Sequence, residues 1–475
     1  MTTLVLEPFK LGDFIQSTAL LRELKLSAPD EPLVVAASRS EVASACLELK
    51  LADQAALIEE AKWLAGDSGD LGEAKMAINL SSSGPSLKMA ANLKSSRKVK
   101  DVVGPALQDG RVVLPGLQRL AMALMAANRR LGTVNLVDIW RHLGPAGLKS
   151  GGALYWPLSE AADGDFLELS RELDSSGGPL VGLHLGCGHH LRRWPVERFA
   201  SLAQALSPAV PVLLGGPSER SLAKRFLAIH SKSRPKSPEP VNLSGRTSLA
   251  SLARVLKKLH LLVCADTSVM HMAAALGVPV AAVFGGPAYA FETGPYCQKA
   301  LIIQGLGPCS PCREIDPCPH GRCLALPKTE EVARAALALL NESEAAFDKT
   351  DAEERISLEE MSRGQSAPGG PWTSQILRTD RDLLGQILRP AGRADPSIPW
   401  RMASAARAAG ALALKLIDSS QLDSVFQGFP KAGASEGSPG AFDMALLEKV
   451  AALAFDLKSD QAVFMEAAGK LLTNH

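Results

Sequence analysis

The residues best suited to chemistry follow a run of apolar residues at positions 259–266. Asp266 ends this run, and Thr267 and Ser268 then open an amphipathic stretch that continues through His271. A second apolar run comes soon after, so the pattern predicts one strand–helix–strand unit. In such units ligands bind outside the carboxyl ends of the strands, and the amides at a helix start favour negative charge. The sequence therefore predicts a phosphate-binding site at the start of this helix.

A second candidate site lies near the N-terminus, in LVLEPFKLGDFIQSTALLRELK. The pattern predicts a strand, then a loop that holds Lys10, Gly12 and Asp13, and then a helix from about Phe14. Gly12 permits a sharp turn or a close approach to a ligand. The Asp13 carboxylate could act as a general base that takes the proton from an attacking hydroxyl. The alternative is that Asp13 serves only as the N-cap of the helix.

The corresponding part of the second half reads LVGLHLGCGHHLRRWPVERFASLAQAL. A predicted strand ends there in a glycine-rich loop, which is followed by Arg192 and then by a helix. An arginine in such a loop could bind a diphosphate through two parallel, charge-assisted hydrogen bonds. The alternative is an exposed arginine without a ligand. Its position at the carboxyl end of a strand, like that of Asp266, favours the binding role.

Four cysteines lie close together within residues 308–323, namely Cys309, Cys312, Cys318 and Cys323. Four thiolates in one short loop can surround a tetrahedral zinc or iron ion, and we favour a structural metal site of this kind. The alternatives are reduced, unpaired thiols and regulatory disulfides. The other four cysteines are scattered, and we expect buried, apolar side chains at Cys46, Cys187, Cys264 and Cys297.

The elements that must hold these residues alternate between strand-like and helix-like runs in both halves of the chain. Such alternation predicts an α/β fold, with parallel sheets covered by helices. Two doubly wound, Rossmann-like domains that face each other would form a cleft between the carboxyl edges of their sheets. We expect these domains at 1–150 and 151–342. Strand-like runs end near residue 340, which predicts a linker at 343–372 and a helical extension at 373–475.

Composition narrows the classes of function. With 475 residues, 46% of them hydrophobic, the chain can build two or three cores. A formal net charge of +1 gives no general reason to bind nucleic acid. The basic run at 93–100 is either a solvated surface or a contact for an anionic acceptor. Neither a signal peptide nor a long apolar stretch is evident, so we expect a cytoplasmic protein.

Several of these motifs together resemble glycosyltransferase family 9, the lipopolysaccharide heptosyltransferases. The resemblance covers roughly residues 3–335. It rests on the two motifs quoted above and on VPVLLGGPSE, LSGRTSLASLARVL and ADTSVMHMAAALGVPVAAVFG. It implies a GT-B type fold with two Rossmann-like domains. It further implies an inverting transfer of heptose from ADP-heptose to an acceptor sugar, with no cofactor or metal in catalysis.

The resemblance also implies roles for individual residues. Asp13 matches the family's catalytic base, with Lys10 and Gly12 beside it on the acceptor side. Arg192 stands where most members have a lysine that neutralises the departing diphosphate. The family's donor site matches Asp266, Thr267, Ser268 and His271, with Ser268 in place of the usual glycine. In the family, the loop that includes Thr293 approaches the nucleotide.

Three hypotheses about function follow. The first is a heptosyltransferase whose acceptor is a glycolipid, the lipopolysaccharide core or a related glycan, at the inner face of the cytoplasmic membrane. The second keeps the chemistry but changes the acceptor to a glycoprotein, such as an adhesin or a flagellar component. Some heptosyltransferases that act on surface proteins carry an iron-binding cysteine loop, which keeps iron open here. The third is a catalytically silent scaffold that binds partners through its tail and cysteine loop.

Overall fold

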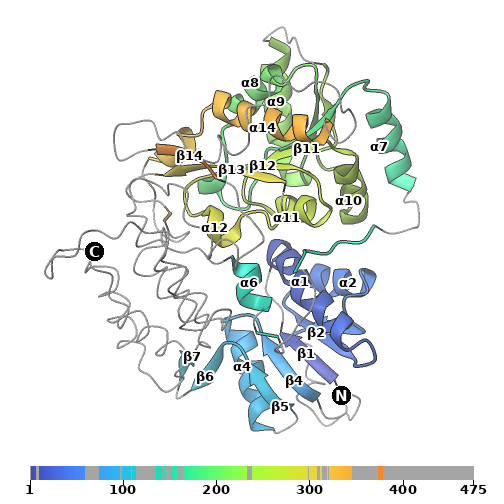
Figure 1. Cartoon of the computed structure of the whole chain (residues 1–475), viewed down its shortest axis with the longest axis vertical. Helices are drawn as coiled ribbons and strands as arrows, with labels where there is room; N and C mark the ends of the chain where they lie inside the picture. The colour runs from blue at the N-terminus through green and yellow to red at the C-terminus, as the bar shows by residue number, and fades with distance from the viewer. Residues whose placement is uncertain are drawn as a thin grey trace, which may run out of the picture. The chain divides into compact units, whose positions relative to one another are not determined.

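The structure is a computed structural model that describes residues 2–6, 10–58, 74–96, 99–108, 110–113, 135–141, 143–144, 152–158, 164–232, 238–297, 299–306, 311–312, 318, 320–344 and 373–377. These residues fall into two compact units, which divide in the chain between Ala153 and Leu154 (Figure 1). The second unit extends to Arg381. Both units are of the predicted α/β class.

The first unit is built on a parallel sheet with the strand order β3-β2-β1-β4-β5. Its strands are β1 (Thr2–Leu6), β2 (Leu33–Ala37), β3 (Gln54–Leu57), β4 (Ala74–Asn79) and β5 (Val99–Val103). A separate antiparallel hairpin joins β6 (Ala106–Gln108) to β7 (Arg111–Val113). The helices are α1 (Leu11–Ser27), α2 (Ser40–Glu48), α4 (Gly84–Ser95) and α6 (Leu136–Arg141).

A buried ion pair joins two of these helices, α1 and α6. Glu23 of α1 is 1% exposed, and its Oε1 accepts hydrogen bonds from Nε and Nη2 of Arg141 at 3.1 and 2.7 Å. Asp138, one turn earlier on α6, lies 3.7 Å from the same guanidinium. Gly152 packs against this guanidinium so closely that a Cβ atom on Gly152 would lie 2.3 Å from Arg141. The pair therefore fixes α6, and the chain just before the second unit, against α1.

The second unit has a seven-stranded sheet with the order β10-β9-β8-β11-β12-β13-β14. Six strands are parallel: β8 (Leu180–His184), β9 (Val210–Leu214), β10 (Val241–Asn242), β11 (Leu261–Cys264), β12 (Val280–Phe284) and β13 (Ala300–Leu306). Without β14, this is the strand order of dinucleotide-binding Rossmann folds. The chain order reverses between β8 and β11.

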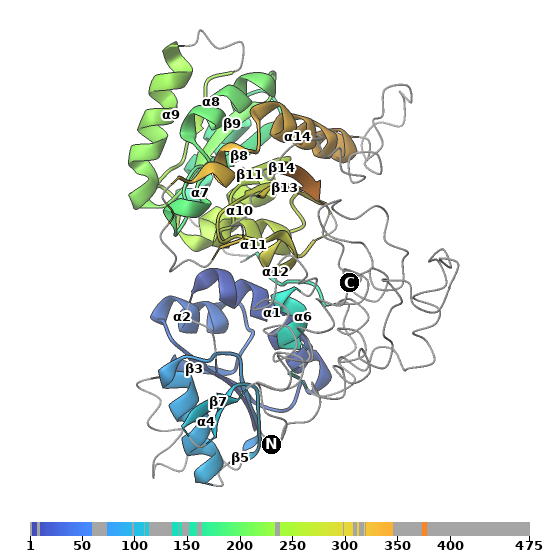
Figure 2. The ribbon, with the colours of Figure 1, turned by 90° about the vertical axis from the view of Figure 1, so that its left-hand side faces the viewer.

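Helices cover both faces of this sheet (Figure 2). One face carries α8 (Val196–Ala205), α9 (Arg220–Lys232) and α14 (Thr329–Glu344), and the other carries α7 (Gly164–Asp174), α10 (Leu249–Lys258) and α11 (Ser268–Ala275). The alternation of strands and helices that the sequence predicted for this half of the chain is confirmed.

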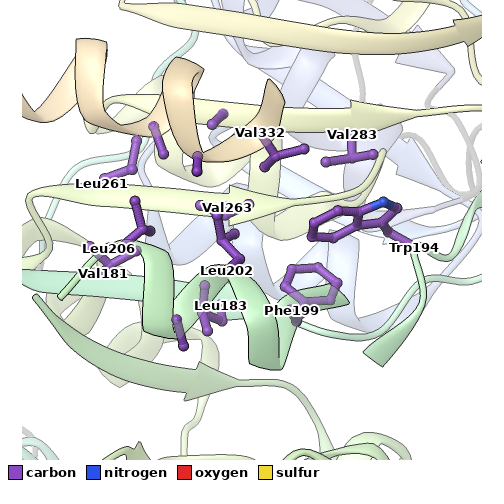
Figure 3. Packing of buried hydrophobic residues seen from close by; sticks show 14 of the residues in the cluster. Val181, Leu183, Trp194, Phe199, Leu202, Leu206, Leu261, Val263, Val283 and Val332 are labelled. Atoms are coloured by element: carbon purple, nitrogen blue, oxygen red, sulfur yellow. The ribbon is translucent and has the colours of Figure 1, made fainter. Parts of the chain in front are cut away.

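The core of the second unit lies between the sheet and the helices α8, α9 and α14 (Figure 3). Trp194 is fully buried, and its ring meets the edge of Phe199 at a centroid distance of 4.9 Å. Its indole N–H donates to the carbonyl of Pro327. Val263 of β11 and Val332 of α14 line the same cluster. This packing fixes the start of α8, directly after the loop that holds Arg192.

One prediction fails at the edge of this sheet. The helical extension was expected to begin at residue 373, but Thr373–Leu377 forms a strand, β14, which pairs antiparallel with β13. The backbone of β13 is buried along its whole length, and its outer edge needs hydrogen-bond partners that an added strand supplies. The segment reads TSQIL, which has neither a continuous apolar run nor a strict alternation of apolar and polar residues, so its sequence does not indicate a strand. The remainder of the predicted linker and extension, from residue 345, lies outside the described residues.

The Glu23–Arg141 pair gives a test of how the first unit is held together. The substitution Arg141→Leu leaves a buried carboxylate without its arginine, so we expect the free energy of unfolding to fall by about 3 kcal/mol. Chemical denaturation measures this change. As a control, Glu31→Ala removes the exposed pair between Glu31 and Lys75 and should cost less than about 1 kcal/mol. Equal losses in the two variants would contradict a special role for the buried pair.

Candidate functional site

The predicted site residues of the second unit meet at the point where its strand order reverses. Arg192 lies in a 3₁₀ turn, His190–Arg192, after β8, and Asp266 follows β11. These strands are neighbours and parallel, so the two loops leave the same edge of the sheet. In open α/β sheets the ligand binds at this kind of reversal. The structure thus brings together two residues that lie 74 positions apart in the sequence.

An ion pair joins these residues. Nη1 of Arg192 donates to Oδ2 of Asp266 at 2.9 Å, and the two side chains are 17% and 7% exposed. A carboxylate alone would repel a phosphate, but here its charge is compensated and it fixes the orientation of the guanidinium. A guanidinium carries five N–H donors in a planar fork, so it can bind a carboxylate and phosphate oxygens together. The pair can therefore serve as an oriented anion binder.

His271 lies behind this pair as a buried, neutral imidazole. It is 3% exposed, and its Nε2 lies 3.9 Å from Oδ1 of Asp266. Burial lowers the pKa of His271 to about 4; the nearby Asp266 opposes this shift and Arg192 adds to it. Its Nδ1 has no hydrogen-bond partner within the described part of the chain. His271 is therefore uncharged near pH 7 and supports the pair by packing.

The helix start beside Asp266 has the predicted form. Thr267 is the N-cap of α11, and its hydroxyl accepts a hydrogen bond from the amide of Met270 at 3.3 Å. Ser268 is the first helical residue. The first amides of a helix lack intrahelical partners and attract anions. Thr267 and Ser268 thus form the helix N-terminus directly after Asp266.

A glycine turn supports the Arg192 loop from behind. Gly286 follows β12 in a left-handed conformation with φ +61°, and a Cβ atom there would lie 2.2 Å from the carbonyl oxygen of Leu191. The amide of Gly286 donates to Sγ of Cys323 at 3.0 Å, and its carbonyl accepts from the amide of Cys312 at 3.2 Å. The cysteine-rich loop therefore packs against the residue that supports the neighbour of Arg192.

The predicted residues of the first unit lie at the start of α1. The helix begins at Leu11, three residues before the predicted start, so Gly12 and Asp13 occupy its first turn and not a loop. The N-cap is Lys10, which makes no side-chain cap hydrogen bond. The alternative in which Asp13 is the N-cap is therefore wrong. A carboxylate in the first turn is favoured by the partial positive charge of the helix start.

The cysteines separate into two groups. Cys46, Cys187, Cys264 and Cys297 are buried, as predicted. Of the clustered four, Cys309 lies outside the described residues, Cys312 and Cys318 are partly exposed and Cys323 is buried. Among the described residues, no three His, Cys, Asp or Glu side chains are placed to hold a metal ion.

Two contacts to Asp266 were not predicted as such. The thiol of Cys187 lies 3.5 Å from the carbonyl oxygen of Asp266, and burial raises the pKa of this thiol. The hydroxyl of Thr293, in the short helix α12 (Ala290–Thr293), donates to Oδ2 of Asp266 at 3.3 Å. Cys187 follows its strand closely, which could have drawn attention to it. Thr293 lies in the loop that the family resemblance places near the nucleotide.

The part of the chain that holds these residues is similar to known proteins. Residues 158–320, which include Arg192, Asp266 and His271, match the model of the family described as Glycosyltransferase family 9 (heptosyltransferase). This segment of the chain is therefore similar to glycosyltransferase family 9. Lipopolysaccharide heptosyltransferase 1 of Pseudomonas aeruginosa is 32% identical to this chain over 165 residues. These residues cover 34% of this chain and 44% of the relative. The match thus spans less than half the length of that family 9 relative.

Solved family 9 structures share the fold. A glycosyltransferase family 9 protein from Veillonella parvula, 19% identical, aligns with a TM-score of 0.54 over 72% of this chain and 97% of its own. ADP-heptose lipopolysaccharide heptosyltransferase II of E. coli, 20% identical, aligns with a TM-score of 0.51 over 73% and 100%. The fold is therefore the GT-B type that the sequence predicted. In the described part of the chain, no helix is long and apolar enough to span a bilayer.

The buried His271 predicts a pH-dependent stability. Its pKa is about 4 in the folded chain, below the ordinary 6.5, so the unfolded chain takes up the proton first as the pH falls. The contribution of the neutral imidazole to the free energy of unfolding is complete above pH 6.5 and is lost towards pH 4. Over this range we expect wild type to lose stability more steeply than His271→Gln, by up to about 1.4 kcal/mol per pH unit.

Chemical denaturation at several pH values measures both slopes. The exposed His190, in the turn that holds Arg192, supplies the control. His190→Gln should keep the wild-type slope. If His271→Gln also keeps it, the imidazole is not held neutral by burial.

Proposed function

We propose that this chain is an inverting glycosyltransferase that moves heptose from ADP-heptose to a lipopolysaccharide core or a related surface glycan. The observation that carries the proposal is the Arg192–Asp266 pair beside the N-terminus of α11, at the strand-order reversal of a Rossmann-like sheet. Oriented N–H donors at that point suit the diphosphate of a nucleotide sugar. ADP-heptose is the donor named for the E. coli relative with the same fold.

In the proposed reaction the Asp13 carboxylate takes the proton from the acceptor hydroxyl. The oxygen attacks the anomeric carbon from the face opposite the diphosphate, and the bond between that carbon and the phosphate oxygen breaks. ADP leaves with the bonding electrons, and its developing charge is stabilised by the Arg192 guanidinium and by the first amides of α11. Lys10 and Gly12, in or next to the first turn of α1, belong to the acceptor side in this proposal.

The mechanism uses one residue from each unit. Asp13 lies in the first turn of the helix that follows β1, and Arg192 lies in the turn that follows β8. Each position is at the carboxyl edge of its own parallel sheet, where ligands of such folds bind. A glycolipid acceptor would bring the chain to the inner face of the cytoplasmic membrane as a peripheral protein. That location and the identity of the acceptor glycan are parts of the proposal.

Transfer assays with purified protein test this function. We expect heptose transfer from ADP-heptose and none from UDP-glucose. Asp13→Asn should lower kcat by a factor of about 10² to 10⁴, because the hydroxyl loses its general base. Arg192→Met should lower kcat by about 10² to 10³, because the leaving diphosphate loses an oriented cation.

Asp30→Asn is the matched control, since Asp30 is an exposed aspartate just after the same helix. It should retain wild-type kcat. Wild-type protein that neither binds ADP in calorimetry nor transfers sugar would refute the proposed function. Full activity of Asp13→Asn would refute the role of Asp13 alone.

We also propose a structural zinc or iron ion in the cysteine-rich loop. The backbone amide of Cys312 and Sγ of Cys323 both contact Gly286, and Sγ of Cys318 accepts a hydrogen bond from the amide of Gly321 at 3.2 Å. Thiolates that accept N–H hydrogen bonds are suitable metal ligands. As placed, the described residues Cys312, Cys318 and Cys323 do not form a metal-binding group, so the proposal requires Cys309 as a fourth ligand and a closer approach of the other three thiols around the ion. The ion would hold the loop against Gly286 and take no part in the transfer.

Elemental analysis tests the metal. We expect about one zinc or iron ion per chain in the wild type, and a loss of most of it in Cys318→Ser, because a structural site needs all four ligands. Cys46→Ser, which changes a buried thiol in the first unit, should retain the metal. Metal-free wild type with four readily titrated thiols would favour reduced cysteines, and resistance of those thiols until reductant is added would favour disulfides.

A further inference from the structure

A single buried amide interrupts the apolar strand β13. The strand reads ALIIQGL, and the side chain of Gln304 is wholly buried. A buried amide must be hydrogen-bonded, because leaving its donors or acceptor unsatisfied costs more than a hydrogen bond gains. None of the proposed chemistry uses Gln304. Its partners therefore indicate what it does.

Those partners lie at the start of α12. Oε1 of Gln304 accepts from the amide of Ala290 at 3.0 Å, and Nε2 donates to the carbonyl of Ala288 at 3.1 Å. The N-cap of α12, Tyr289, makes no side-chain cap hydrogen bond. The first amide of this four-residue helix is thus satisfied from a neighbouring strand and not from its own sequence. Gln304 fixes both the position and the direction of α12.

The other end of α12 contacts the candidate site. Thr293, its last residue, donates through its hydroxyl to Oδ2 of Asp266 at 3.3 Å. The same oxygen accepts from Nη1 of Arg192 at 2.9 Å. A continuous series of hydrogen bonds therefore runs from the floor of the sheet, through α12, to the guanidinium.

We propose that Gln304 is a positioning residue for Arg192, acting through Thr293 and Asp266; in its consequence for catalysis this inference rests on the proposed function. Thr293 and Arg192 share one oxygen of Asp266, so the hydroxyl limits the rotation of the carboxylate. The carboxylate in turn sets the angle of the guanidinium. A shift of α12 releases the first of these restraints, although Gln304 itself touches no ligand.

A double-mutant cycle tests the series. Gln304→Leu removes both hydrogen bonds to the start of α12, together with a longer one of 3.4 Å to the carbonyl of Gly305, at similar side-chain volume. Thr293→Val removes the hydroxyl. Each variant should lower kcat for heptose transfer about tenfold with a smaller change in KM, because Arg192 acts on charge that develops in the transition state. The double variant should fall about tenfold and not a hundredfold, since both changes break one series. Thr293→Ser, which retains the hydroxyl, should remain close to wild type.

The control is Ile303→Val, a loss of one buried methylene from the adjacent residue of β13. It should lower the melting temperature without lowering kcat. Independent effects that multiply to about a hundredfold in the double variant would overturn the proposal, as would an unchanged kcat in Gln304→Leu.

Hydrogen exchange gives a readout that needs no turnover. Gln304→Leu should speed exchange both in residues 288–294 and in residues 265–272, whereas Ile303→Val should not. Faster exchange at 288–294 alone would overturn the coupling to Asp266. Absence of transfer and of ADP binding in the wild type would refute the proposed function, while the exchange pattern would still decide the physical link.

Discussion

The ion pair between Arg192 and Asp266 is the interaction on which the candidate site depends. Its partners come from two loops that follow adjacent parallel strands, β8 and β11, after which the chain turns to opposite faces of the sheet. The pair joins these loops at the point where the strand order of the sheet reverses. Around it the fold supplies a helix N-terminus on one side and a buried, neutral imidazole on another. Without the pair, an isolated carboxylate would stand where an anion has to bind.

Close backbone packing explains why this pair can be held so firmly. Gly286 lies against the carbonyl of Leu191 with no room for a side chain, and its left-handed conformation favours glycine. The carbonyl and the amide of the same glycine are hydrogen-bonded to the cysteine-rich loop, through Cys312 and Cys323 respectively. A loop that looks separate in the sequence therefore belongs to the support of Arg192. A metal-bound, reduced or disulfide-bonded state of these cysteines would therefore affect the packing of Gly286 against the loop that holds Arg192.

Local chemistry was predictable and the contacts between distant segments were not. The strand, cap and helix around Asp266 and Thr267 follow from an apolar run, a capping residue and a helical period, all within a dozen residues. Alternation predicted parallel sheets, but not the strand order that makes β8 and β11 neighbours and so brings Arg192 to Asp266. The strand β14 was missed because its pairing depends on the free edge of β13 and not on its own five residues. Gln304 carried a signal, a polar residue in an apolar strand, whose meaning needed the fold.

The charges of the site bear on how it would bind a diphosphate. His271 is neutral near pH 7, and the charge of Arg192 is matched by that of Asp266, so these three residues have no net charge. Attraction by net charge alone would thus be weak, and binding would depend on the direction of the guanidinium N–H groups and the first amides of α11. Directional donors discriminate by geometry, so they can stabilise a departing diphosphate more than the bound donor. The value of the pair then lies in the angle at which Asp266 holds Arg192, and residues that fix this angle from a distance, among them Gln304, become part of the same constraint.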